Sequence, residues 1–207
     1  ILPSLNKKYL VTGAAGFIAS QVSKQLLDQG DRVVGVDNLN DYYDVRLKIW
    51  RLEQLKAHPN VENFTFSDLD IEDQAKLVDL FKTEGPFDAV LNLAAHAGVR
   101  YSMENPHVYL STNAEGNLNL LECMRALSCQ KLVLASTSSL YAGQKMPFNE
   151  DLAVNEPVSP YAASKKAGEL MAYSYHKLHQ LDVSVVRYFT VFGLSLIHIS
   201  EPTRLSG

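Results

Sequence analysis

The segment Thr12-Gly13-Ala14-Ala15-Gly16-Phe17-Ile18-Ala19 lies between the apolar run Tyr9-Leu10-Val11 and a stretch with helical periodicity. In such a strand–loop–helix unit, glycines permit a tight turn and let backbone N–H groups approach a pyrophosphate, while the start of the helix carries partial positive charge. The segment therefore predicts a dinucleotide cradle. Its expected cofactor-binding residues are Gly13, Gly16, Phe17 and Ile18.

A second apolar run, residues 32–36, ends on Asp37. An acidic residue at the end of this second strand accepts hydrogen bonds from the adenosine ribose hydroxyls and repels a 2′-phosphate, which favours NAD over NADP. A glycine pattern alone also fits an ordinary strand–helix turn. The strand, the glycines, the helix, the second strand and Asp37 together predict an NAD site.

Strand and helix patterns alternate along the chain. This alternation predicts an α/β fold with a doubly wound parallel sheet (Rossmann fold) in one NAD-binding domain, residues 1–193. Further strands are expected at 64–66, 89–93, 131–136 and 183–188, and further helices at 45–56, 72–83, 106–127 and 160–178. In each of the last two helices a stripe of residues falls on one helix face: Leu110, Ala114, Leu118, Leu121 and Met124 in the first, and Ala163, Ala167, Leu170, Ser174 and Leu178 in the second.

The composition of the chain argues against some classes of binding partner. A chain of 207 residues with 46% hydrophobic residues can bury one sizeable core. Its net charge of −4, with Lys and Arg scattered, predicts neither a nucleic-acid nor a membrane partner, and no apolar run has the length of a membrane span. Cys123 and Cys129 have neither metal-type nor redox-type spacing, so we expect buried thiols in a cytoplasmic protein.

Tyr161 and Lys165 are four residues apart on a predicted helix, so both project from one face. A lysine ammonium beside a phenol lowers the pKa of the phenol, which would make Tyr161 a general base. Thr137, Ser138 and Ser139 follow a buried strand, where a hydroxyl can bind the reacting oxygen of a substrate. These residues also fit an ordinary helix surface and a polar strand end; their place in a nucleotide-binding fold favours catalysis.

Together with Leu93-Ala94-Ala95 and the segment 187–193, these motifs resemble the extended short-chain dehydrogenase/reductase family of nucleotide-sugar enzymes, the NAD-dependent epimerase/dehydratases. The similarity runs from about residue 8 to residue 193. Three loops, residues 37–43, 97–106 and 145–148, most resemble those of the UDP-glucuronate 4-epimerases within this family.

The resemblance implies roles for individual residues. Tyr161 would be the base, Lys165 would orient Tyr161 and the nicotinamide ribose, and Thr137 would be the hydroxyl partner. The implied cofactor contacts also include Asn38, Asp70 and Ile71 at the adenosine and Leu93, Ala94 and Ala95 at the nicotinamide ribose. The implied substrate-binding residues are Arg100, Ser138, Ser139 and Thr190. No metal is implied, and His176 and His179 are expected on a solvated helix face.

The implied reaction is the NAD-dependent 4-epimerisation of a UDP-sugar, UDP-glucuronate to UDP-galacturonate, through a transient 4-keto sugar. The alternatives are a UDP-glucose 4-epimerase and a dTDP-glucose 4,6-dehydratase-like enzyme. Dehydration needs an acidic pair after Thr137, where this chain has Ser138 and Ser139. Thr190 stands where many UDP-glucose epimerases carry Asn, and its hydroxyl suits a sugar carboxylate. The resemblance further implies a homodimer packed through helices 106–127 and 160–178, although the Leu and Ala stripes of these helices fit core-facing surfaces equally well.

After Gly193 the chain no longer resembles the family, which continues into a substrate domain that closes over the UDP. We expect residues 194–207 to be a non-native tail and the substrate domain to be largely missing. A catalytically silent NAD-binding fragment is therefore the alternative of a different class. Measured turnover distinguishes it from an epimerase.

Overall fold

One parallel sheet of six strands organises the part of the chain that the computed structural model describes, residues 6–192. The expected tail at 194–207 lies outside the described residues. The strand order is β3-β2-β1-β4-β5-β6. The strands are β1 (Lys8–Thr12), β2 (Arg32–Asp37), β3 (Phe64–Asp68), β4 (Ala89–Asn92), β5 (Lys131–Thr137) and β6 (Asp182–Tyr188).

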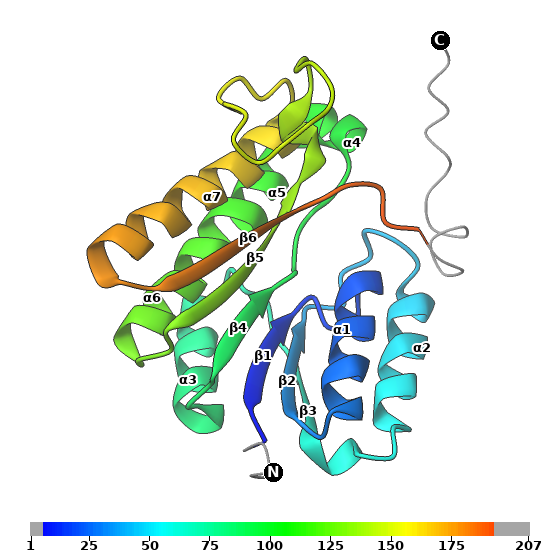
Figure 1. Cartoon of the computed structure of the whole chain (residues 1–207). Helices are drawn as coiled ribbons and strands as arrows, with labels where there is room; N and C mark the ends of the chain where they lie inside the picture. Colours follow the sequence, from blue (N-terminus) through cyan, green and yellow to red (C-terminus); the bar gives the residue numbers. More distant parts are fainter. Residues whose placement is uncertain (1–5, 193–207) are drawn as a thin grey trace.

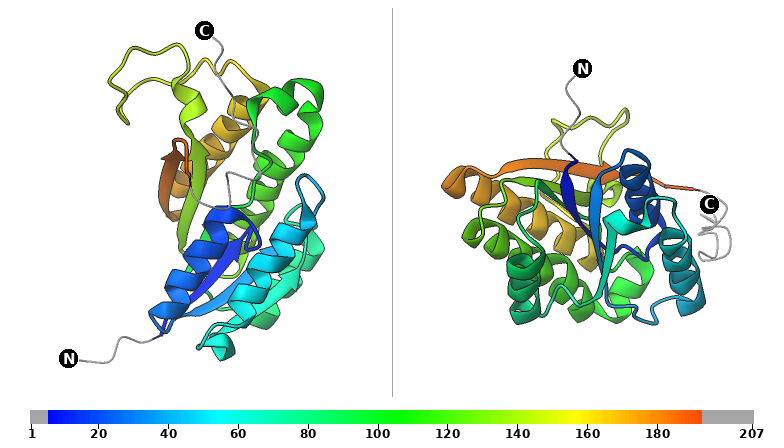
Figure 2. Two further views of the ribbon diagram at one scale, coloured as in Figure 1. Left: turned by 90° about the vertical axis from the view of Figure 1, so that its right-hand side faces the viewer. Right: turned by 90° about the horizontal axis from the view of Figure 1, so that it is seen from below.

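Helices cover both faces of this sheet, as Figure 1 and Figure 2 show. One face carries α1 (Phe17–Asp28) and α2 (Val45–Lys56). The other carries α3 (Gln74–Glu84), α5 (Pro106–Leu110), α6 (Asn117–Ala126) and α7 (Pro160–His179). The short elements are α4 (Val99–Glu104) and the 3₁₀ turns η1 (Val61–Asn63) and η3 (Ser138–Tyr141). The doubly wound parallel fold expected from the alternating pattern is confirmed.

The helix expected at 106–127 is interrupted, which corrects the prediction of one continuous α-helix. A π-helical segment, η2 (Ser111–Gly116), separates α5 from α6. The wider π turn shifts the helix faces on its two sides relative to each other. Consequently the residues of the predicted stripe do not share one environment: Leu121 and Met124 are buried, whereas Leu110 is exposed and its neighbour Tyr109 is buried.

The α7 stripe does not face the core: Ala163, Leu170, Ser174 and Leu178 are exposed and Ala167 is half-buried. The buried face consists of Ala162, Ser164, Lys165, Gly168, Glu169 and Ala172. Polar side chains can be buried when they find hydrogen-bonding partners, and here Ser164 pairs with Asn113 and Glu169 with Ser136 and Arg187. A count of apolar residues alone therefore selects the wrong face of this helix.

A chain of buried hydrogen bonds, which we call the polar chain, connects β1 to α7. The Thr12 hydroxyl donates to Asn92 Oδ1 (2.8 Å), and the Asn92 side chain donates to Asn117 Oδ1 (3.0 Å). Asn117 in turn donates to the carbonyl of Gly168 on α7 (3.4 Å). These contacts fix the end of β1 relative to the helix that carries Tyr161 and Lys165.

A buried ion pair joins α7 to the edge strand β6. The guanidinium of Arg187 binds the Glu169 carboxylate through two hydrogen bonds of 2.9 Å each. Ser136 of β5 donates to the same carboxylate (2.6 Å), and Arg187 also donates to the Tyr141 hydroxyl (3.0 Å). Because every charged atom has a partner, this network ties α7, β5 and β6 into one unit.

We expect Arg187→Met to lower the free energy of unfolding by about 2–3 kcal/mol, because it removes the charge-assisted hydrogen bonds of the buried Glu169 carboxylate and leaves Lys166, at 3.7 Å, as its neighbouring cation. Lys131→Met is the matched control on the same strand pair, since Lys131 and Asp182 form an exposed ion pair at 3.1 Å. That variant should lose at most about 1 kcal/mol. Urea unfolding measures both values, and equal losses would contradict the role assigned to the buried pair.

Candidate active site

A cleft opens at the carboxyl ends of β1, β2 and β4, where the strand order reverses. In open α/β sheets this reversal is where ligands bind. Of the expected cofactor-binding residues, those that line this switch-point cleft are Gly13, Gly16, Asp37, Asn38, Asp70, Ile71, Leu93, Ala94 and Ala95. Phe17, Ile18, Tyr161 and Lys165 do not belong to its lining.

The glycine loop approaches the end of β4 too closely for a larger residue. Gly13 has φ of +70°, and a Cβ at this position would lie 3.0 Å from the backbone of Ala94. The Thr12 hydroxyl fixes the facing segment by accepting hydrogen bonds from the backbone N–H groups of Leu93 and Ala94, both at 3.1 Å. At this place in the cleft, the backbone of the glycine loop therefore packs directly against the backbone of residues 93–94.

Asp37 holds the glycine loop as well as facing the cleft. Its carboxylate accepts hydrogen bonds from the backbone N–H groups of Ala15 (3.1 Å) and Leu39 (2.9 Å). The buried ammonium of Lys48 lies 3.6 Å from Asp37 Oδ1 and donates to Asn40 Oδ1 at 2.9 Å. Burial lowers the pKa of Lys48, and the Asp37 charge opposes that shift.

Several residues that line the cleft were not predicted from the sequence: Val36, Asn40, Tyr42, Tyr43, Lys48, Leu69, His96 and Thr112. Most of them belong to loops, or to helices that reach the cleft from outside the strand ends. Lys48 faces the cleft from α2, but nothing in the sequence around it distinguishes it from a lysine on a solvent-exposed helix face. The proximity of Lys48 to the end of β2 is the only sequence signal that could have indicated it.

Tyr161 lies at the start of α7, with its ring 5.9 Å from that of Tyr109 in an edge-to-face arrangement. We expected a lowered pKa for Tyr161, but burial raises it, while the neighbouring Thr137 side chain opposes the shift. Lys165 is not among the groups that shift the Tyr161 pKa, and burial lowers the pKa of Lys165 itself to about 8. The Thr137 side chain, at the end of β5, therefore lies close enough to Tyr161 to influence its pKa.

Three of the four expected substrate-binding residues follow the ends of β5 and β6, and the fourth, Arg100, lies on α4. The two strands run parallel with Thr137 opposite Tyr188, so Ser138, Ser139 and Thr190 leave the sheet at the same edge. Ser138 and Ser139 are half-buried and Thr190 is exposed. Arg100 is exposed on α4, a helix that packs against α7.

Cys123 and Cys129 are free and buried, as expected, and burial raises the pKa of Cys123 to about 11. His176 and His179 lie exposed near the end of α7. Among residues 6–192, no group of three or more His, Cys, Asp or Glu side chains is arranged to hold a metal ion. Within the same residues, no helix is long and apolar enough to cross a membrane.

Comparison with known proteins now assigns the family. The family model described as GDP-mannose 4,6 dehydratase matches residues 10–198. The chain belongs to the NAD-dependent epimerase/dehydratase family. A UDP-glucuronate 4-epimerase of Thermodesulfobacterium geofontis is 58% identical over 89% of the chain and 56% of the relative. The chain thus spans about half the length of the curated relatives it matches.

Solved structures of this family share the fold. The UDP-glucuronic acid 4-epimerase of Bacillus cereus, in complex with UDP-glucuronic acid and NAD, has a TM-score of 0.81 at 34% identity and matches 90% of this chain and 57% of its own. The dTDP-glucose 4,6-dehydratase DesIV of Streptomyces venezuelae, with NAD and TYD bound, has a TM-score of 0.76 at 32% identity, covering 87% and 55%. The shared architecture thus includes epimerases and dehydratases.

We expect the Lys165 ammonium to titrate near pH 8, which NMR of the lysine Cε signals can follow, with Lys165→Met identifying the signal. An unfolded lysine titrates at about 10.4, so between these two values the unfolded chain binds more protons than the folded chain. The contribution of Lys165 to the free energy of unfolding therefore rises with pH across this window. Lys165→Met should remove that rise, and an ordinary lysine titration would contradict the depressed pKa.

Proposed function

We propose that the protein is an NAD-dependent UDP-sugar 4-epimerase whose substrate is UDP-glucuronate. The observation that carries the proposal is the placement of Tyr161 and Thr137 together at the end of β5, with the glycine-floored switch-point cleft on the neighbouring strands. The fit of NAD to that cleft rests on the glycine loop, because Gly13 (φ of +70°) permits the turn that brings the backbone N–H groups at the start of α1 to the cleft, where they can meet a pyrophosphate.

The residues of the chain divide the work in this proposal. Gly13 and Gly16 hold the pyrophosphate, Asp37 and Asn38 the adenosine ribose, and Asp70 and Ile71 the adenine, while Leu93, Ala94 and Ala95 leave room for the nicotinamide ribose. When bound, NAD would supply a reversible acceptor for the hydride of the sugar C4. Lys165 orients Tyr161 and adds positive charge beside it.

Proton transfer falls to Tyr161 and Thr137. Tyr161 removes the proton of the sugar 4-hydroxyl when that carbon is oxidised and returns it when the carbon is reduced. The Thr137 hydroxyl interacts with the Tyr161 side chain and opposes the rise in its pKa, so it favours the phenolate needed for the first step. Burial acts in the opposite direction, so in this proposal the lysine charge is needed once substrate is present.

The identity of the sugar rests on the edge formed by β5 and β6. Ser138, Ser139 and Thr190 offer hydroxyl donors there, which suit a carboxylate at C5 of the sugar. A 4,6-dehydratase needs acidic residues after the catalytic threonine, and this chain carries serines at those positions. We therefore favour UDP-glucuronate over UDP-glucose, and epimerisation over dehydration.

The decisive experiment adds UDP-glucuronate to the purified chain with NAD and follows the absorbance of reduced nicotinamide, with UDP-glucose as the comparison. We expect a transient rise with UDP-glucuronate alone, and no rise with Tyr161→Phe, which lacks the base. An equal rise with UDP-glucose would refute the carboxylate specificity. If NAD is released on denaturation and neither sugar gives a signal, the chain is an NAD-binding fragment without turnover.

We also propose that the protein forms a homodimer through α5, α6 and α7. Leu110, Tyr173 and Leu178 are exposed on these helices, and a hollow lined by His107, Leu110, Leu118 and Met171 lies between α5 and α7. The stripe of α7 faces outward rather than toward the core, which supplies the apolar surface that an isologous interface needs.

Sedimentation equilibrium tests the dimer. Leu110→Glu would bury a charge in the proposed interface, so we expect dimer dissociation to increase at least about tenfold. Ile49→Glu is the matched control, because Ile49 has a similar exposure (48% against 51%) but lies on α2, on the opposite face of the sheet. A monomeric unsubstituted chain, or equal effects of the two variants, would contradict this interface.

A further inference from the structure

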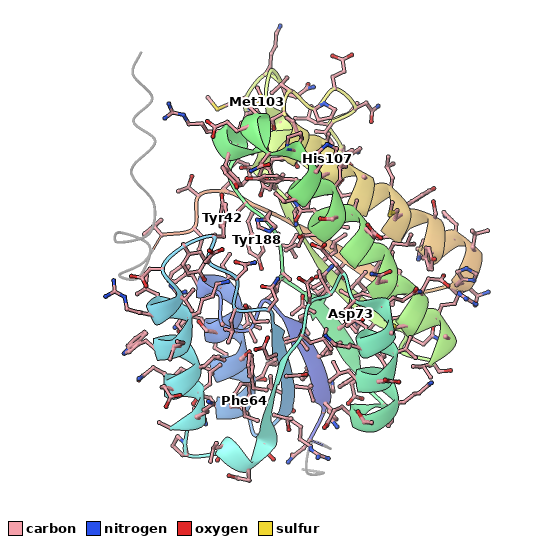
Figure 3. All side chains as sticks on the ribbon, turned by 180° about the vertical axis from the view of Figure 1, so that it is seen from behind. Tyr42, Phe64, Asp73, Met103, His107 and Tyr188 are labelled. Carbon is pink, nitrogen blue, oxygen red and sulfur yellow. The ribbon has the colours of Figure 1, made fainter. Side chains whose placement is uncertain are left out.

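Tyr42 crosses the rim of the switch-point cleft. It belongs to the loop of residues 38–44 between β2 and α2, and its hydroxyl donates to the carbonyl of Ala97 at 2.5 Å, on the segment that joins β4 to α4. Figure 3 shows Tyr42 on this loop, turned toward that segment. The two sides of the cleft are thus connected by one side chain.

The Tyr42 ring is held as well as its hydroxyl. It packs edge-on against His96 (5.1 Å between ring centres) and at a tilt against Tyr101 (5.5 Å). Both partners follow β4, whereas Tyr42 precedes α2. Ring and hydroxyl therefore hold the 38–44 loop against the opposite side of the cleft.

Gly98 provides an independent sign that this contact shapes the backbone. It has φ of +97°, and a Cβ at this position would lie 3.1 Å from the Tyr42 hydroxyl oxygen. The adjacent carbonyls of Ala97 and Gly98 also each accept a hydrogen bond from Tyr109, at 2.9 Å. The backbone of Ala97 and Gly98 is therefore fixed by the buried side chain of Tyr109, and the absence of a side chain at Gly98 leaves room for the Tyr42 hydroxyl.

We propose that Tyr42 is a positioning residue that retains the cofactor by closing the 38–44 loop across the switch-point cleft. The inference rests on the proposed function. A reaction that withdraws a hydride from the sugar and returns it in the same turnover requires the cofactor to stay bound until the return. A side chain that must swing away before the cleft opens lengthens that residence, and it needs no contact with the sugar.

The test compares Tyr42→Phe with Tyr101→Phe in the whole chain. The two tyrosines have nearly equal exposure (39% and 38%), but the Tyr101 hydroxyl accepts from Asn105 of the same segment (2.8 Å) and does not cross the cleft. Stopped-flow displacement of fluorescent etheno-NAD by NAD gives the dissociation rate. We expect etheno-NAD to dissociate about fivefold faster from Tyr42→Phe, because the loss of one hydrogen bond costs about 1 kcal/mol. The dissociation rate from Tyr101→Phe should equal that from the unsubstituted chain.

Amide hydrogen exchange of residues 38–44, measured in the absence of cofactor, tests directly whether the hydrogen bond from Tyr42 to Ala97 holds this loop. Tyr42→Phe should accelerate exchange in this loop, and Tyr101→Phe should not. If the unsubstituted chain binds etheno-NAD and Tyr42→Phe releases it at the same rate, retention by Tyr42 is wrong while the NAD site stands. If the unsubstituted chain binds no etheno-NAD, the proposed function fails and cofactor retention fails with it.

Discussion

The polar chain from Thr12 through Asn92 and Asn117 to Gly168 is the constraint on which the site depends. Each member is buried, so a lost partner would leave a polar group without water and without a hydrogen bond. The glycine loop and the helix that carries Tyr161 belong to opposite faces of the sheet. Because amide and hydroxyl groups have fixed reach, the polar chain sets the distance between them.

The arrangement of the strands could be predicted from the sequence, and the inner faces of the helices could not. Strands buried on both sides read as continuous apolar runs, and they alternate with helical patterns, so the doubly wound sheet follows from local sequence. In α7 the buried face includes Ser164, Lys165 and Glu169, whose partners come from other elements. Only the folded chain reveals that these polar groups are satisfied.

The site divides in the same way. Gly13, Asp37 and Ala94 sit at strand ends, where the topology of the fold fixes their position, and all three line the cleft. Tyr42 reaches the cleft from a loop and Lys48 from a helix, and the periodicity of the sequence does not predict that such residues line a site. The pKa of Tyr161 was also mispredicted, because spacing along a helix reports which side chains share a face but not how far each is desolvated.

Because the π-helical segment η2 lies between α5 and α6, the number of residues in this segment determines which side chains of α5 face the core. Each residue of an α-helix turns the next by about 100°. Removing one residue between Ser111 and Gly116 would restore regular winding, and would swing Tyr109 away from the carbonyls of Ala97 and Gly98 that it binds. Among related chains, insertions and deletions at this point would be as disruptive as substitutions in the site itself.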